Sequence, residues 1–282
     1  MPCNVRTGAS LAAILVLLAG LPVRPIQADV IAIQLANEGV ILSDGEGTSV
    51  MIDGMVTEPY SVYGGLPEPY LDLFLEAAGP FSGINLALAS HQHHDHNQPS
   101  AACEFLQHSP STRFVSSVQV MDLMREKCRK FITSSPNVQI IDPQYGAPET
   151  LQLENGAVTV FLLTHGGGKY AVLQNFGHLV EIGGMRVLHI GDADMAAADF
   201  QRAGVDQMDI DIALIPFWYF QPGPGGEIVS QFLNAPHQIA THIPPGEMQE
   251  IREYMEINYP NVLVPREPME HATFSLTEPP LP

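Results

Sequence analysis

Residues 84–97 read Ile-Asn-Leu-Ala-Leu-Ala-Ser-His-Gln-His-His-Asp-His-Asn, an apolar run followed at once by four histidines and one aspartate. The apolar run predicts a buried strand, and the polar cluster begins where that strand ends. On a helix, His91 and Asp95 would share a face while His93 pointed away, so a strand end turning into a loop gathers these groups better. Imidazole and carboxylate are ligands for zinc and similar divalent ions. The stretch therefore predicts a metal site, with a solvated histidine-rich loop as the alternative.

Other ligand types also follow predicted strands. His165 comes after an apolar run that ends at Leu163, Asp192 after one that ends at Ile190, and His242 directly follows a short strand. One metal ion needs three or four protein ligands, and six adjacent positions cannot supply two complete sites. We therefore expect His165, Asp192 and His242 to converge with the cluster.

Four other histidines are weaker candidates for the site. His94 lies between predicted ligands and is expected to contact solvent or to support the site from outside the ligand set. His178, His189 and His237 remain alternatives to the single later histidines. His189 lies inside a predicted strand, where alternate residues point inward, so we expect it in the core. His237 follows a proline and is expected in a loop.

The remaining pattern mixes strands and helices without an internal repeat or a linker. Strands are expected over residues 30–35, 39–42, 49–53, 84–89, 113–115, 138–141, 158–163, 170–174, 178–182, 186–190, 210–215 and 239–242. Helices are expected over residues 70–78, 100–107, 118–131, 196–203 and 247–255. The Pro- and Gly-rich segments 54–69 and 221–226 are expected to be loops. This order predicts a mixed α/β layered domain.

In this order the motifs resemble those of the metallo-β-lactamase superfamily. The resemblance is carried by His91-x-His93-x-Asp95-His96, then His165, then Gly191-Asp192, then His242. It is closest to the branch of the ascorbate-6-phosphate lactonases and related broad hydrolases, because a histidine after a strand is followed there by a glycine-bounded hairpin and a Gly-Asp pair. The resemblance spans residues 53–242 and implies an αββα four-layer sandwich with two metal ions at one sheet edge.

The resemblance also implies a ligand set. It assigns His91, His93 and His165 to the first metal ion, Asp95, His96 and His242 to the second, and Asp192 to both. Asp53 matches an acidic residue that supports the site from outside, although an Asp before Gly54 is also an ordinary turn signal. The ions are expected to be zinc, and manganese or iron would suit the same ligands.

Two departures from the family pattern narrow the chemistry. The segment around His165 lacks the Thr-Pro-Gly-His run of many lactamase and glyoxalase-II-like members, so β-lactam turnover is not indicated. His93 stands where the flavodiiron oxidoreductases have a glutamate, which weakens a redox interpretation.

The implied activity is hydrolysis of an ester, lactone or amide bond of a small molecule by a hydroxide that bridges the two metal ions. Asp95 would orient this nucleophile and accept a proton. Two alternatives stay open, a phosphoester hydrolase of the same fold and a non-catalytic metal-binding protein of the cell envelope. The aromatic run 217–220 predicts either a wall for an apolar substrate or simple core packing. Lys169 is a weak candidate for meeting an anionic group.

Residues 1–28 have the pattern of a secretory signal peptide, with Arg6 before an apolar segment and a small residue at Ala28. An uncleaved membrane anchor is the alternative. Of the 282 residues, 282 − 28 = 254 would remain, with residues 29–264 as the hydrolase domain and 265–282 as a proline-rich surface tail. The expected location is therefore secreted or periplasmic, without a stable membrane anchor after cleavage. The oligomeric state is left open.

Charge argues against nucleic acid as a partner. The chain has 12 basic and 31 acidic residues. Cleavage after residue 28 would remove Arg6 and Arg24 and leave a net charge of 10 − 31 = −21. So acidic a body repels phosphate backbones, which favours a small-molecule substrate. Cys103 and Cys128 would remain after cleavage, and in an oxidising compartment they either pair or stay as buried thiols.

Overall fold

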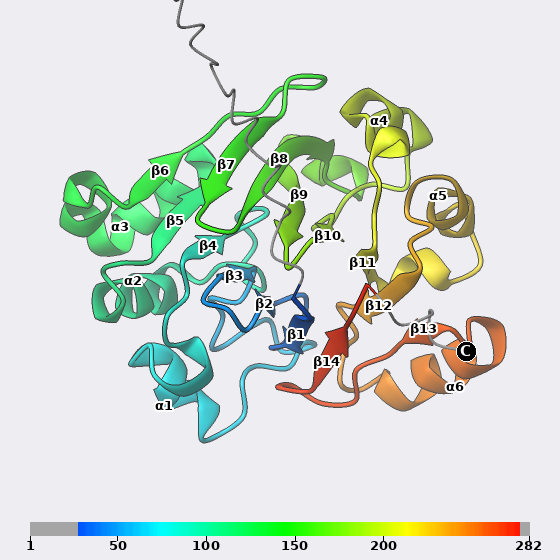
Figure 1. Ribbon diagram of the computed structural model, residues 1–282, viewed down its shortest axis with the longest axis horizontal. Helices are drawn as coiled ribbons and strands as arrows, with labels where there is room; N and C mark the ends of the chain where they lie inside the picture. The colour runs from blue at the N-terminus through cyan, green and yellow to red at the C-terminus, as the bar shows by residue number, and fades with distance from the viewer. Residues whose placement is uncertain (1–27, 277–282) are drawn as a thin grey trace, which may run out of the picture.

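Two seven-stranded sheets form the centre of the molecule in a computed structural model that describes residues 28–276 (Figure 1). The first sheet has the order β14 (His271–Phe274), β1 (Val30–Gln34), β2 (Val40–Ser43), β3 (Ser49–Ile52), β4 (Leu86–Leu88), β5 (Arg113–Ser116) and β6 (Val138–Ile140). The second has the order β13 (Val262–Leu263), β12 (His237–Thr241), β11 (Ile212–Pro216), β10 (Met185–His189), β9 (Gln174–Ile182), β8 (Gly156–Thr164) and β7 (Glu149–Leu153).

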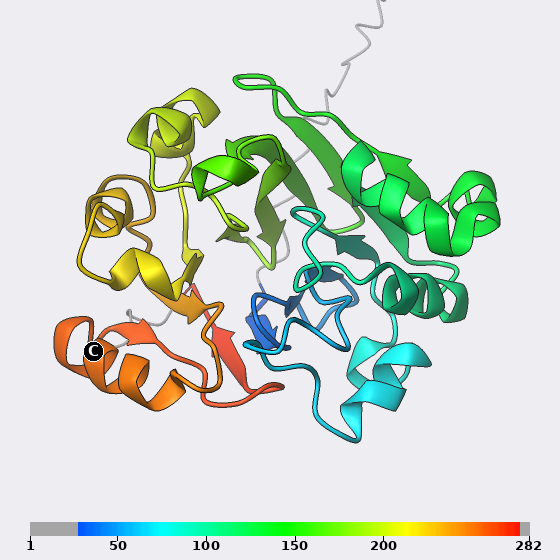
Figure 2. The ribbon, with the colours of Figure 1, turned by 180° about the vertical axis from the view of Figure 1, so that it is seen from behind.

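Helices cover the outer face of each sheet (Figures 1 and 2). The first sheet is covered by α1 (Tyr70–Leu75), α2 (Pro99–His108) and α3 (Val118–Ser134). The second is covered by α4 (Ala197–Ala203), α5 (Gly225–Phe232) and α6 (Met248–Asn258). Short 3-10 turns lie at η1 (Gly79–Phe81), η2 (Gly168–Tyr170), η3 (Val205–Gln207) and η4 (Phe217–Phe220). The predicted αββα sandwich is confirmed.

The alternation of side chains along a strand explains how one short strand packs both against the other sheet and against the helices. In β4, Leu86 and Leu88 join the apolar core between the sheets, whereas Ala87 packs with the helices outside. Successive side chains on a strand point to opposite faces, so a strand buried on both faces is apolar throughout. The same holds in β10, where Val187 faces the inner core and Leu188 the outer one.

The strand directions bring several strand ends to one edge. β3 runs parallel to β4, and β10, β11 and β12 run parallel to one another. β8 and β10 are both antiparallel to β9 and therefore share one direction. Since carboxyl ends of parallel strands meet at the same edge, the residues after β3, β4, β8, β10 and β12 gather there.

Three expectations differ from the structure. Residues 170–174 do not form a strand, because Gly167 and Gly168 adopt positive φ and turn the chain through η2, so β9 begins at Gln174. The expected loop 221–226 is shorter in the structure, because α5 already begins at Gly225. The segment expected to be a tail after residue 264 contains β14, which pairs antiparallel with β1, so the sheet extends to Phe274.

Cys103 of α2 and Cys128 of α3 form a disulfide bond between helices on the outer face of the first sheet. Their Cα atoms lie 6.1 Å apart, within the range that a disulfide needs. The expected signal peptide falls almost entirely on residues 1–27, outside the described part of the chain. Within residues 28–276, no helix has both the length and the hydropathy needed to cross a membrane.

Candidate metal centre

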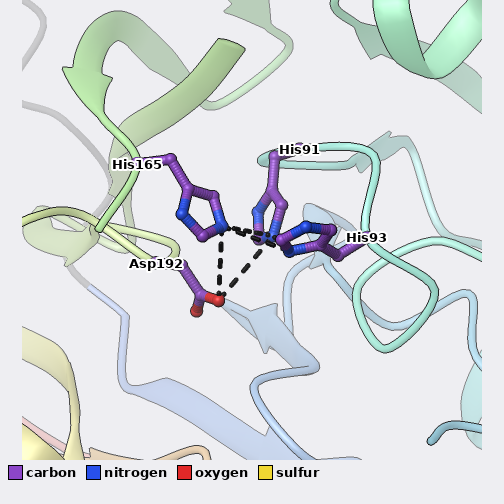
Figure 3. Close-up of side chains that lie close together, drawn as sticks. All are labelled: His91, His93, His165 and Asp192. Atoms are coloured by element: carbon purple, nitrogen blue, oxygen red, sulfur yellow. Dashed lines mark hydrogen bonds and ion pairs between the residues drawn. The ribbon is translucent and has the colours of Figure 1, made fainter. Parts of the chain in front are cut away.

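Three histidines from two sheets meet at the shared edge (Figure 3). His91 and His93 follow β4 of the first sheet, and His165 follows β8 of the second. His91 Nε2 lies 3.0 Å from His93 Nδ1 and 3.2 Å from His165 Nε2, and the latter two atoms are 3.2 Å apart. The structure thus brings together the three residues that the sequence assigns to a first metal ion.

A second group lies beside the first. His96 Nε2 is 3.1 Å from His242 Nε2, and His242 extends from the end of β12. Asp95 Oδ2 lies 3.5 Å from His242 Nε2 and 3.9 Å from His96 Nε2. His96 and His242 are closely packed with Asp95 at their side, and Glu38 also lies within ligand distance of His96, His242 and Asp192.

Asp192 lies between the two groups, each oxygen facing a different one. Its Oδ2 is 3.8 Å from His91 Nε2 and 3.6 Å from His165 Nε2. Its Oδ1 is 3.3 Å from His96 Nε2 and 3.4 Å from His242 Nε2. This is the arrangement expected of a carboxylate that bridges two metal ions.

Hydrogen bonds fix which ring nitrogens face the centre. His91 Nδ1 bonds Ser90 Oγ at 3.0 Å, and His165 Nδ1 bonds the Gly166 carbonyl at 2.8 Å. His96 Nδ1 bonds Asp53 Oδ2 at 2.8 Å. An imidazole whose Nδ1–H is donated in this way presents the lone pair of Nε2, which is how metal-binding histidines are oriented.

The donor set fits a pair of divalent cations. In neutral His91 and His165 the two Nε2 atoms carry no hydrogen, so their 3.2 Å separation is a contact between two lone pairs that a shared cation would satisfy. Nitrogens bound to one tetrahedral zinc ion at its usual bond length would lie about 3.3 Å apart. Asp192 Oδ1, moreover, is buried without a hydrogen-bond partner in the described chain.

Local electrostatics favour the metal-binding protonation states of His91 and Asp192. Burial lowers the pKa of His91, with the neighbouring charge of His96 acting in the same direction. Burial raises the pKa of Asp192, but His96 and His242 outweigh it and hold that pKa well below its usual range. Neutral imidazole and ionised carboxylate are the forms that bind metal. Burial lowers the pKa of His96, but the charges of Asp192 and Asp53 outweigh it and hold that pKa well above its usual range, so metal binding there would displace a proton.

Asp53 is a buried acceptor at the base of the centre. Besides His96, its carboxylate accepts hydrogen bonds from the Ser90 backbone N–H at 2.6 Å and from Ser90 Oγ at 2.5 Å. Burial raises the pKa of Asp53, yet the charge and hydrogen bond of His96 outweigh it, so the net pKa lies below the usual range. Of the two interpretations of Asp53, the contacts favour support of the site over an isolated turn signal.

Sequence reasoning missed Glu38 and Asn37, both in the turn between β1 and β2. Glu38 is fully buried, with Oε2 3.5 Å from His96 Nδ1, and burial raises its pKa well above the ordinary value against the opposing charge of His96. Asn37 Nδ2 donates to the Asp95 backbone carbonyl at 3.1 Å and to Asp95 Oδ2 at 3.3 Å. A polar Asn-Glu pair in a tight turn at the same edge as Asp53 was the available signal.

The remaining histidines lie outside the two groups. His94 is exposed. His189 is buried at the end of β10, where it accepts from the Gly191 N–H, leaving Nε2 to donate to the Glu38 carbonyl at 3.2 Å. His178 is buried within β9, and His237 is the first residue of β12, packed on Phe274 rather than in a loop.

Aromatic rings flank the centre on both sides. Tyr63 and Trp218 pack edge-on against His242, with ring centroids 4.6 Å and 4.8 Å away. Tyr170 packs against His93 at 4.9 Å, and Lys169 Nζ lies 4.5 Å above the Tyr170 ring. Within the run 217–220, Trp218 contacts His242 of the centre, whereas Tyr219 and Phe220 are buried in the core, as the core-packing interpretation predicted for them.

Comparison with known proteins places the chain among related folds. The family model of the beta-lactamase superfamily domain matches residues 39–219, more than half of the 282 residues. No protein with a curated description matches the chain.

Solved structures share the fold at low sequence identity. The metallo hydrolase Igni18 from the archaeon Ignicoccus hospitalis matches with a TM-score of 0.55 and 16% identity, covering 89% of this chain and 100% of that one. Zn²⁺-bound PqqB from Methylobacterium extorquens matches with a TM-score of 0.54 and 13% identity, covering 88% and 100%. CmlA, a diiron β-hydroxylase from Streptomyces venezuelae, matches with a TM-score of 0.54 and 14% sequence identity. The match covers 89% of this chain and 54% of the CmlA chain.

Proposed function

The chain belongs to the metallo-β-lactamase superfamily, and we propose that it is a dinuclear metal-dependent hydrolase of small-molecule esters, lactones or amides. The observation that carries this proposal is Asp192, whose two oxygens face two separate groups of buried histidines. A carboxylate so placed, with the ring nitrogens on both sides oriented by their own hydrogen bonds, holds two cations a short distance apart. A purely structural cation would need only one of the two groups.

The ligand assignment follows the two groups. His91, His93 and His165 would hold one ion, His96, His242 and Asp95 the other, and Asp192 both. Zinc suits this nitrogen-rich set best, and manganese or iron would also bind. Bound ions would supply a water of lowered pKa and would stabilise the negative charge that develops on the attacked carbonyl.

The chain's own residues would position the reaction. Asp95 lies close enough to both histidines of its group to accept a proton from the attacking water, and Asn37 holds the Asp95 carboxylate through Nδ2. Tyr63 and Trp218 would limit the access of bulk water to His242. Low water content strengthens the electrostatic interactions on which the step depends.

The fold by itself is compatible with more than hydrolysis, since CmlA is a hydroxylase. What favours hydrolysis here is the nitrogen-rich first group, in which His93 stands where flavodiiron proteins carry a glutamate. A phosphoester is a less favoured substrate, and a polynucleotide the least, because a chain of net charge −19 repels phosphate backbones.

Export to an oxidising compartment is part of the proposal. The pattern of residues 1–28 and the Cys103–Cys128 disulfide both support it, because disulfides persist outside the reducing cytosol. A secreted or periplasmic location would be checked by fractionating cells that express the full chain and by determining the N-terminus of the exported form.

The test of function is a hydrolase panel on protein of measured metal content. Esters, lactones, amides and phosphoesters would be assayed before chelation, after chelation and after metal is added back, with and without oxygen. We expect turnover of at least one carbonyl substrate that is lost with metal and does not depend on oxygen. His91→Ala should abolish it and exposed His108→Ala should not.

Three results would contradict the proposal. Turnover that survives complete metal removal would exclude a metal-dependent reaction. Turnover that requires oxygen would indicate oxidative chemistry. Metal-loaded protein without activity on any member of the panel would leave the metal-binding alternative as the better account.

A further inference from the structure

A cavity of about 170 Å³ reaches two residues of the candidate centre, His242 and Asn37, from the side of α6 and of residues 265–268. We propose that this cavity binds a neutral apolar group of the substrate, a six-membered ring or a branched chain of similar size, next to the bond that is cut. This inference rests on the proposed hydrolase function and names the substrate class.

The cavity wall is mainly aliphatic. Its apolar residues include Leu35, Ala36, Ala240, Ile243, Met248 and Pro265. They come from the end of β1, from residues 240–248 at the end of β12 and the start of α6, and from the chain before β14. With Gly64 of the loop 54–69, four segments distant in sequence line one space that opens to solvent. Burial of apolar surface is the main energy that such a wall offers a ligand.

Several polar groups in the wall donate hydrogen bonds to protein acceptors, and the wall atoms that have no partner among the described residues, Gln34 Oε1, Asn37 Oδ1 and His242 Nδ1, are buried away from solvent. Thr241 Oγ1 donates to Glu38 Oε1 at 3.4 Å, Gln34 Nε2 donates to the Asn37 carbonyl at 2.9 Å, and the His242 N–H donates to the same carbonyl at 3.1 Å. A ligand that needs hydrogen bonds would have to replace these contacts. An apolar group leaves them intact.

Charge at the cavity favours a neutral occupant. Arg266 and Glu267 are neighbouring exposed residues with opposite charges, so together they add no net charge. The net negative charge of the chain disfavours an anionic substrate group. A cationic substrate group is disfavoured too, because it would compete with the metal ion that His242 is proposed to bind.

The volume sets the size of the group. A cavity of about 150 Å³ lined by aliphatic and aromatic side chains holds one benzene molecule. The 170 Å³ space therefore suits one six-membered ring, and a fused bicyclic system would exceed it and extend toward the solvent.

A probe that cannot be hydrolysed separates binding from catalysis. Cyclohexyl methyl ketone has the ring and the carbonyl but no bond to cleave, and its dissociation constant would be measured by calorimetry on metal-loaded protein. We expect Met248→Phe, which places a rigid ring at the wall and narrows the cavity, to weaken binding at least about tenfold. Gln249→Phe introduces the same side chain at the next, exposed position and should leave binding unchanged.

Turnover gives the second readout. Methyl acetate, methyl cyclohexanecarboxylate and cyclohexyl acetate would be compared by proton release. The wild type should prefer one ring ester over methyl acetate by about tenfold or more in kcat/KM, and Met248→Phe should remove the preference while methyl acetate turnover stays within about twofold. Which ring ester is preferred shows on which side of the bond the cavity lies.

Each outcome decides the inference. The inference is overturned if the ketone does not bind, or if it binds equally well to Met248→Phe and Gln249→Phe. It is also overturned if the wild type prefers the monomethyl ester of adipic acid and Arg266→Gln removes that preference. Should Met248→Phe fail to fold, Met248→Ala replaces it and should bind a fused bicyclic ketone more tightly than the wild type does. Cavity-dependent ketone binding without turnover of any ester, lactone or amide would contradict the hydrolase proposal while the cavity assignment stands.

Discussion

Asp53 Oδ2 lies 2.8 Å from His96 Nδ1, and both side chains are completely buried. This hydrogen bond turns Nε2 of His96 toward His242 and Asp192. Asp53 adopts a positive φ of 49° directly before Gly54, a conformation that only a few non-glycine residues tolerate. The contact joins the end of β3 to the loop after β4 and thereby fixes one half of the candidate centre.

Asp53→Asn should weaken the second metal ion more than the first. Asn tolerates the same backbone conformation, and the change removes the negative charge behind His96 directly, whereas it reaches His91 of the first group only through Ser90. We expect metal affinity of the second group to fall by about 10- to 100-fold, as for other residues that orient a ligand. Competition with a fluorescent chelator measures this, and the exposed Asp206→Asn is the control. Equal affinity in both variants would mean that Asp53 does not orient His96.

Single ligand substitutions should separate the two ions. His165→Ala removes a donor from the first group only, and His242→Ala one from the second only. Metal analysis after gel filtration should show a decrease from two ions per chain toward one in each variant. In Asp192→Asn, binding of both ions should be weakened, because the two oxygens of Asp192 face both groups. Two tightly bound ions in Asp192→Asn would contradict the bridging role.

Removing the disulfide should lower stability without changing activity. Cys103 and Cys128 are 25 residues apart, and closing such a loop in the unfolded chain corresponds to roughly 3 kcal/mol. Urea unfolding of the Cys103→Ala/Cys128→Ala protein should show a loss of that order, with turnover preserved because both residues lie on the outer helices. Two free thiols in the unreduced chain from residue 29 onward would show that the bond does not form.

His178 should make stability depend on mild acid. Burial, followed by the charge of neighbouring His189, lowers the pKa of His178 to about 3, whereas the unfolded side chain titrates near 6.5. As pH falls below 6.5 the unfolded chain gains a proton that the folded chain excludes, so stability is lost toward pH 3.

The variant His178→Gln isolates this effect. Between pH 7 and 5 it should lose about 2 kcal/mol less unfolding free energy than the wild type. Exposed His271→Gln should behave like the wild type. Parallel curves for the wild type and His178→Gln would show that His178 is protonated in the folded protein.

The sequence predicted the sheet core and the convergence of the candidate ligands because both depend on local pattern. Residues 84–89 are apolar on both faces of β4, and His91, His165, Asp192 and His242 each follow a strand by a few residues. In the fold, the parallel strands bring these positions to one edge of the sheets. The order of the strands along the sequence does not reveal this.

Long-range contacts explain what was not predicted. Glu38 is an acid in a turn, and only the fold shows that it is fully buried beside His96. Residues 265–282 predict a tail because prolines and acids flank the short stretch 271–274, yet β14 pairs with β1, which satisfies its backbone. The cavity at Met248 and Pro265 likewise depends on four segments that share no motif.

Return of metal to chelated protein tests the central claim most directly. Activity on the best substrate of the panel would be followed against the number of ions bound per chain. The account predicts that full activity returns only as binding approaches two ions, and that Asp192→Asn recovers little at any metal concentration. Full activity in metal-free protein, or in Asp192→Asn, would contradict it.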